Sequence, residues 1–161
     1  MAFERRTWPV SVAILSVLAT GGSSCGGFVE SGGDVKRLTV GAEGGTLATE
    51  GFALVVPPHA LGEIFTLSAQ RAAMDAPAGP AFTVGPGHVT FDPTIPADVT
   101  LHYDATVHAH PADVFAAILV ADVWHMLARP AGDTGTAGIA HGVTPGVGTF
   151  GVVDCPGGVC P

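Results

Sequence analysis

Apolar and polar side chains alternate in short runs along the middle of this 161-residue chain. The clearest runs are Leu38-Thr39-Val40, Phe65-Thr66-Leu67-Ser68-Ala69, Val89-Thr90-Phe91 and Val99-Thr100-Leu101-His102-Tyr103. A side-chain period of two is typical of strands that bury one face. Glycine and proline, which break helices and form turns, separate the runs at Gly44-Gly45, Pro57-Pro58, Gly85-Pro86-Gly87 and Pro93. Short strands punctuated this often predict an all-β fold, a sandwich or a barrel.

One segment, residues 111–126, allows two interpretations. Pro111 near its start and its alanine-rich body favour a helix. As strands it would be a hairpin, with strands at residues 114–120 and 123–127 and a turn near Asp122. Intrinsic propensity alone slightly favours the helix.

The N-terminal segment has the composition of an export signal. Arg5 and Arg6 precede an apolar stretch from Trp8 to Ala19. This stretch is too short to cross a bilayer core, which needs roughly 20 residues. We therefore predict that residues 1–24 are a cleaved signal peptide rather than an uncleaved anchor or a buried helix. Residues 25–34, which are rich in glycine, would then form a short flexible tether.

Small residues lead from the apolar stretch into a cysteine. The string Leu18-Ala19-Thr20-Gly21-Gly22-Ser23-Ser24-Cys25 resembles a bacterial lipoprotein signal, in which the cysteine is lipidated and becomes the new N-terminus. Gly22 departs from that pattern, because a branched apolar residue is usual there. The resemblance implies a lipid anchor on Cys25, and Gly26 after it implies the outer membrane of a Gram-negative cell. Ordinary cleavage after Gly21 or Ser24 would instead release a secreted protein.

The chain has three cysteines, so one is left over if two of them pair. With Cys25 lipidated, Cys155 and Cys160 remain. The Pro156-Gly157-Gly158 sequence between them can turn the chain sharply enough to bring the two cysteines together. A structural zinc site would need about four ligands, and no second cysteine pair is present. We predict a structural disulfide in the C-terminal tail, residues 155–161.

Acidic residues outnumber basic ones by 14 to 6, which gives a formal net charge of −8. A chain this acidic repels phosphate backbones, so we expect no nucleic-acid partner. Between the tether and the tail, residues 35–154 are long enough to bury one hydrophobic core, and we predict a single domain there.

Three motifs, in order, resemble the ZU-five domain, a β-sandwich named after zona occludens proteins and netrin receptors. They are Gly44-Gly45-Thr46-Leu47 with Pro57-Pro58-His59-Ala60-Leu61, then Val89-Thr90-Phe91-Asp92-Pro93 with Val99-Thr100-Leu101, and finally Trp124 with Gly148-Thr149-Phe150-Gly151-Val152-Val153. The resemblance implies an antiparallel β-sandwich and the hairpin interpretation of residues 111–126. We also expect Trp124 to fill the core, and at most one short helical turn, near residues 58–61.

Some relatives in that family cut their own chain at a His-Phe-Ser step in a late strand. The corresponding step here is Thr149-Phe150-Gly151, and glycine has no hydroxyl to attack the chain. The two serines of the predicted mature part, Ser31 and Ser68, lack the Gly-x-Ser-x-Gly setting of a hydrolase nucleophile. We therefore predict no self-cleavage and no catalytic residue.

The alternative interpretation is a catalytic function that depends on histidines. His108 and His110 would lie on the same face of a strand and could chelate a metal, with His102 or Asp104 completing the site. That arrangement would suit a metal-dependent hydrolase. Asp92 and Asp98 flank a proline-rich turn that could hold calcium, although few oxygen ligands are near them in the sequence. We expect neither a metal nor a cofactor.

The prediction for function is a non-catalytic binding or structural module of the cell envelope. It would be held to a membrane through Cys25 and would bind a protein or carbohydrate ligand. Exposed loops on a rigid sandwich commonly present binding surfaces. The candidate surface is therefore formed by the turns at residues 75–80 and 133–138.

Overall fold

The computed structural model describes residues 29–32, 35–108, 110–158 and 160. The predicted signal peptide and Cys25 lie outside these residues. Within the described part of the chain, no helix is long and apolar enough to cross a membrane.

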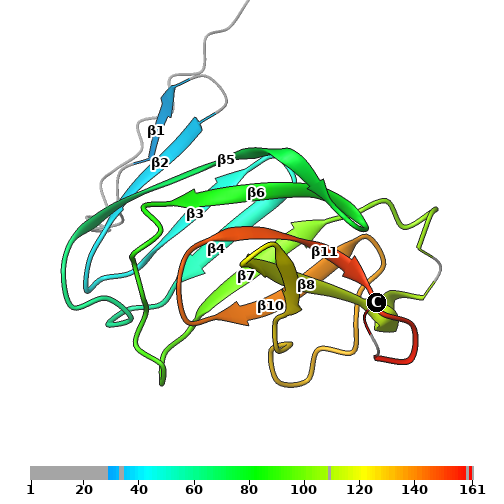
Figure 1. Cartoon of the computed structure of the whole chain (residues 1–161). Coiled ribbons are helices and arrows are strands. Elements are labelled where there is room, and N and C mark those ends of the chain that lie inside the picture. Colours follow the sequence, from blue (N-terminus) through cyan, green and yellow to red (C-terminus); the bar gives the residue numbers. More distant parts are fainter. Residues whose placement is uncertain (1–28, 33–34, 109, 159, 161) are drawn as a thin grey trace, which may run out of the picture.

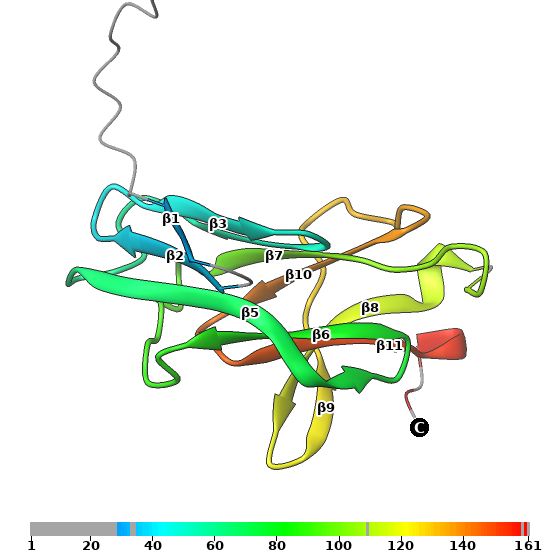
Figure 2. The same ribbon diagram turned by 90° about the horizontal axis from the view of Figure 1, so that it is seen from above.

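Two antiparallel sheets pack face to face (Figure 1; Figure 2). The larger has seven strands in the order β1-β2-β5-β6-β11-β8-β9, and the smaller has four in the order β10-β7-β4-β3. The strands are β1 (Val29–Gly32), β2 (Val35–Val40), β3 (Gly45–Thr49), β4 (Phe52–Val56), β5 (Phe65–Ala76), β6 (Gly79–Gly85), β7 (Ala97–His102), β8 (Val114–Val120), β9 (Val123–Met126), β10 (Ile139–Thr144) and β11 (Thr149–Asp154). The predicted all-β antiparallel sandwich is confirmed.

The alternation in the sequence becomes an inner and an outer face. In β7, Ala97, Val99 and Leu101 are buried between the sheets, whereas Asp98 and His102 are exposed. Burying one side chain in two along each strand removes apolar area from water and fixes the register, since a slip of one residue would turn the strand inside out.

Three phenylalanine rings join the two sheets at the centre of the core. The ring of Phe52, from β4 in the smaller sheet, stacks on Phe82 of β6 at 5.3 Å and on Phe150 of β11 at 5.9 Å, measured between ring centroids. All three side chains are at most 4% exposed. Offset rings of this kind add to the burial of apolar area.

The ambiguous segment folds as the predicted hairpin of β8 and β9. Its register runs from Ala117 opposite Met126 to Val120 opposite Val123. The turn residues Ala121 and Asp122 both have positive φ, 49° and 63°, as in the two-residue turns that suit the twist of a hairpin. β8 also pairs with β11 over six residues, so tertiary pairing outweighs the slight helical propensity.

Two local predictions differ from the structure. At residues 58–61 the chain makes a tight turn that is not helical, with His59 at φ 66°, so the place predicted for a helical turn is wrong. Single 3-10 turns lie instead at Pro111–Asp113 (η1) and Pro156–Gly158 (η2). In the predicted flexible tether, Val29–Gly32 form β1 and pair with β2.

Trp124 does not enter the main core, contrary to our prediction. It lies on β9, the edge strand of the larger sheet, and is only partly buried. Its ring packs on the outer face of that sheet, against a second small cluster that consists of Ala117, Val153 and Cys155. In Figure 2 the β8–β9 hairpin extends away from the smaller sheet.

Several connections gather at one end of the sandwich, which we call the loop end (Figure 2). It consists of residues 103–113, residues 127–138, the β5–β6 turn and η2. Backbone hydrogen bonds join these segments: Cys155 donates to the carbonyl of Asp113, and Ala78 donates to the carbonyl of Val152.

Candidate functional site

A groove of about 1210 Å³ opens between the β3–β4 turn and the larger sheet. The residues that line this groove are Val35, Lys36, Thr49, Glu50, Gly51, Gln70, Arg71, Ala73, Pro80 and Phe82. It exists because β5 is longer than its neighbour: β2 pairs with β5 only as far as Lys36 opposite Ala69. Beyond that point, the register of β5 with β6 shifts between Arg71 and Asp75. Along the groove, therefore, no described strand pairs with the edge of β5 that faces β2.

The groove has an apolar base and a polar rim. Phe82 lies at the base, where Gly51 lets the β3–β4 turn approach its ring: a Cβ on this glycine, at φ +79°, would be 3.4 Å from Cζ of Phe82. Glu50, Gln70 and Arg71 are exposed at the rim. The groove thus combines an apolar base with a few hydrogen-bonding and charged side chains, and such polar groups can orient a ligand.

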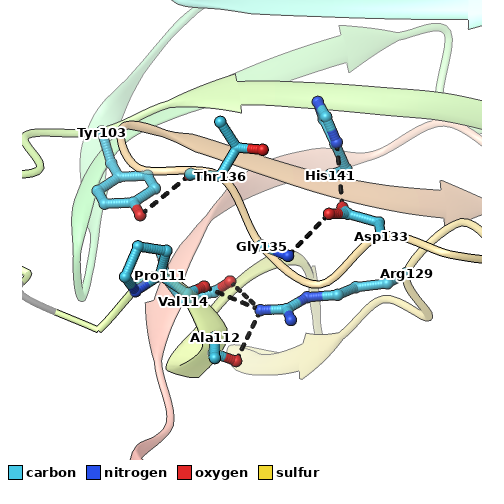
Figure 3. Close-up of polar contacts among 9 residues, drawn as sticks. All are labelled: Tyr103, Pro111, Ala112, Val114, Arg129, Asp133, Gly135, Thr136 and His141. Atoms are coloured by element: carbon cyan, nitrogen blue, oxygen red, sulfur yellow. Dashed lines mark hydrogen bonds and ion pairs between the residues drawn. The ribbon is translucent and has the colours of Figure 1, made fainter.

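At the loop end, Arg129 holds the start of β8 in place (Figure 3). Its Nη2 lies 3.1 Å from the carbonyl oxygen of Pro111, 2.8 Å from that of Ala112 and 2.8 Å from that of Val114. The guanidinium also lies 4.2 Å from the centroid of the Phe115 ring. Arg129 therefore satisfies the carbonyls of η1, which have no strand partner.

Asp133 and His141 form a second polar contact beside it (Figure 3). Oδ1 of Asp133 accepts a hydrogen bond from the Gly135 N–H at 2.8 Å, and Oδ2 lies 3.1 Å from Nδ1 of His141. The hydrogen bond from the Gly135 N–H is the largest cause that lowers the pKa of Asp133 below its usual value. His141 and Arg129 lower this pKa by smaller amounts, and partial burial of the carboxyl opposes the shift. This contact fastens residues 133–135 to β10.

The Asp133 contact predicts a pH-dependent stability. Because its pKa is lower folded than unfolded, the carboxylate stabilises the fold above about pH 3.9, and the effect disappears as the pH falls through the folded pKa. Asp133→Asn should therefore cost a few tenths to about 1 kcal/mol at pH 6, and the cost should be smaller at about pH 2.5. Urea unfolding at both pH values tests this, with Asp98→Asn as the exposed control. Equal losses at both values would contradict it.

The histidine arrangement of the alternative interpretation, with His108 and His110 on one face of a strand, is not found. His108 and His110 lie in the loop before η1 rather than on a strand. Nδ1 of His108 is 2.9 Å from Oδ2 of Asp154, and its ring contacts Tyr103 edge-on at 5.8 Å between centroids. His110 is exposed. Among the residues that the structure describes, no three histidine, cysteine or acidic side chains gather as a metal site would require.

Asp92 and Asp98, the two residues considered above for calcium, have different surroundings. Oδ1 of Asp92 accepts hydrogen bonds from the Thr94 hydroxyl at 2.6 Å and the Thr94 N–H at 2.8 Å, which lower its pKa. Asp98 lies on the outer face of β7. Asp104 and Thr106 repeat the Asp92 arrangement, and again the hydroxyl and the N–H lower the pKa of the carboxyl. These aspartates shape turns.

The predicted disulfide between Cys155 and Cys160 is present. Cys155 is fully buried in the small outer cluster. The Gly157 N–H donates to Oδ1 of Asp113 at 3.2 Å, so the tail is fastened to η1 as well as closed on itself. The bond therefore holds Cys160 against the small outer cluster.

Gly151, which stands where self-cleaving relatives need serine, has a packing role here. It lies on β11 beneath Trp124, and a Cβ at this position would be 2.8 Å from Cη2 and 3.0 Å from Cζ3 of the indole. The same Cβ would also overlap the Cβ of Ala76. Only glycine lets the tryptophan and the β5–β6 turn lie so close to this strand.

We expect Gly151→Ser to destabilise the protein by about 1–3 kcal/mol, because the added atoms overpack this contact. Gly62→Ser is the matched control, since nothing lies within 4 Å of a Cβ at Gly62. The control should change the stability by less than about 0.5 kcal/mol. Urea midpoints of the two variants provide the measurement, and equal midpoints would show that the contact is not tight.

Of the two turns predicted as a binding surface, neither forms the groove itself. Residues 75–80 lie at the end of β5 and the start of β6, and only Pro80 reaches the groove. Residues 133–138 use their polar groups internally, through Asp133, Gly135 and Thr136. The sequence held no signal for the groove, because its walls come from four strands and a turn that are far apart in the chain.

The fold and the groove define an antiparallel β-sandwich with a candidate ligand site at one side. Compared with known protein families, the sequence matches none, and no curated protein matches it either. The resemblances to a ZU-five domain and to a lipoprotein signal therefore stay predictions.

Proposed function

We propose that this protein is a non-catalytic binding or structural module of the cell envelope, held to a membrane through a lipidated Cys25. The observation that carries the proposal is the groove, about 1210 Å³ in volume, with its apolar base and its rim of Glu50, Gln70 and Arg71. A rigid sandwich with a polar-rimmed groove is suited to hold a ligand. The polar residues of the loop end, by contrast, are engaged in holding loops together.

The place of the groove fits an anchored protein. Val35 and Lys36, which line it, begin the strand that follows β1. Only ten residues of sequence separate Cys25 from Lys36. Residues 29–32 of that segment form β1, so only three residues of sequence separate Cys25 from the first strand, and they span about 14 Å at most. The groove would thus lie close to the membrane and face other envelope components.

The anchor is tested by metabolic labelling with palmitate. The wild-type protein should take up label and fractionate with membranes, whereas Cys25→Ser should do neither. Equal labelling of the two proteins would remove the anchor from the proposal. This result does not depend on the groove, so the lipid anchor and the groove are tested independently.

The groove is tested by binding. The full chain carrying Cys25→Ser, immobilised, should retain an envelope component. A Glu50→Ala, Gln70→Ala double variant should bind that component roughly tenfold or more weakly, because two hydrogen bonds worth about 0.5–1.5 kcal/mol each are lost. Asp98→Ala, on the opposite sheet, is the control and should bind like the parent. Equal binding by both variants would exclude the groove as the site.

A further inference from the structure

A second hollow, on the outer face of the larger sheet, has a different chemistry. It measures about 230 Å³ and is lined by Pro77, Asp122, Val123, Trp124, Val153, Asp154 and Cys160. We call it the Trp124 hollow. Ligand sites for drug-sized molecules span roughly 300–1,000 Å³, so this one would admit a single side chain or a small group.

Among the residues that line this hollow, Trp124, Asp122 and Asp154 are the ones that can attract a cation. Trp124 is only partly buried, and its six-membered ring lies over Gly151, which fixes the orientation of the indole. Asp122 is exposed in the hairpin turn. The side chain of Asp154 is 39% exposed, and only its Oδ2 is engaged, with His108. A cation is attracted to an aromatic face by the quadrupole of the ring and to carboxylates by their negative charge.

The same face of the sheet already contains such a contact. Phe115 packs against the same small cluster as Trp124, and the Arg129 guanidinium lies 4.2 Å from the centroid of its ring. A planar guanidinium can stack on an aromatic ring while its edge donates to oxygen atoms, as Arg129 does to the carbonyls of η1. The Trp124 hollow offers the ring and the oxygens without an arginine of its own among the residues that line it.

We propose that the Trp124 hollow binds an arginine side chain of a partner polypeptide. The guanidinium stacks on the indole and donates to Asp122 and to the free oxygen of Asp154. The formal net charge of −8 favours the approach of a cationic segment. This site lies apart from the groove and shares no lining residue with it.

Two matched probes test the proposal on the full chain: arginine amide, and citrulline amide, its uncharged near-isostere. The chain has two tryptophans, so a Trp8→Phe background leaves Trp124 as the single indole. Its N–H resonance, followed by ¹⁵N NMR, should shift saturably with arginine amide and not with citrulline amide. The affinity should fall as NaCl rises from about 0.05 M to about 0.5 M.

Variants locate the interaction. Asp122→Asn keeps a residue that tolerates the positive φ of this turn, and should weaken binding of arginine amide roughly two- to fivefold. Asp98→Asn, exposed on the other sheet, should leave the affinity unchanged. Equal shifts with both probes, no shift at all, or equal affinities for the two variants would each overturn the proposal. A saturable shift with methyl glucoside but not with arginine amide would also overturn it, in favour of a sugar. None of these results bears on the groove variants.

Discussion

Phe52→Ala should lower the free energy of unfolding by about 3–5 kcal/mol. The Phe52 ring is 2% exposed and stacks on both Phe82 and Phe150, so it is the contact through which the smaller sheet packs on the larger. Truncation removes the buried ring and leaves a cavity that three strands cannot close without moving apart. Urea unfolding followed by far-ultraviolet circular dichroism measures the loss.

Val55→Ala is the control for this substitution, because Val55 lies on the same strand but points outward and is 39% exposed. Its loss should stay below about 1 kcal/mol. Similar losses for the two variants would mean that the sheets are not held together at Phe52, and would contradict the core described here.

Arg129→Met should cost about 2–3 kcal/mol, the largest effect expected from a polar residue in the described structure. Methionine keeps most of the length of the side chain but cannot donate to the carbonyls of Pro111, Ala112 and Val114. The carbonyls of Ala112 and Val114 then lose the Arg129 bond at the point where the chain enters β8, whereas the carbonyl of Pro111 still accepts from the Val114 N–H. Hydrogen exchange should speed up first at the Asp113 and Val114 amides, which donate to the carbonyls of His110 and Pro111, and this would separate a local effect from general loosening.

Arg71→Met is the matched control. The Arg71 guanidinium meets Asp75 at 3.3 Å, but the two side chains are 66% and 67% exposed. Exposed pairs contribute at most about 1 kcal/mol, so this variant should unfold nearly like the wild type. If Arg71→Met were the more damaging substitution, the structural role given to Arg129 would be wrong.

The sequence predicted strands such as β7 because one of their faces is buried, whereas Val89-Thr90-Phe91, with the same alternation, forms only an isolated bridge at Thr90. The alternation at Val99, Thr100 and Leu101 is a local pattern, and the structure buries the first and third of these residues. The β8–β9 hairpin was correct for another reason: the resemblance to ZU-five favoured it, whereas propensity slightly favoured a helix. Its turn, with positive φ at Ala121 and Asp122, contains no glycine and gave little local signal.

The candidate sites could not be predicted from the sequence, because each depends on contacts between residues that are distant in the chain. The carbonyls that Arg129 holds lie 15 to 18 residues earlier in the chain. Trp124 was expected in the core on its size alone, but β9 is an edge strand, and position in the sheet is not encoded in the neighbouring residues. The groove, likewise, follows from β5 being longer than β2.

Site-specific photo-crosslinking in cells tests most directly whether the protein works by binding through its groove. Benzoylphenylalanine in place of Gln70, which is exposed on the rim, should give a discrete cross-linked product on irradiation. The same group in place of Asp98, exposed on the outer face of β7, should give none. No product from position 70, or equal products from both positions, would contradict a groove that holds a ligand.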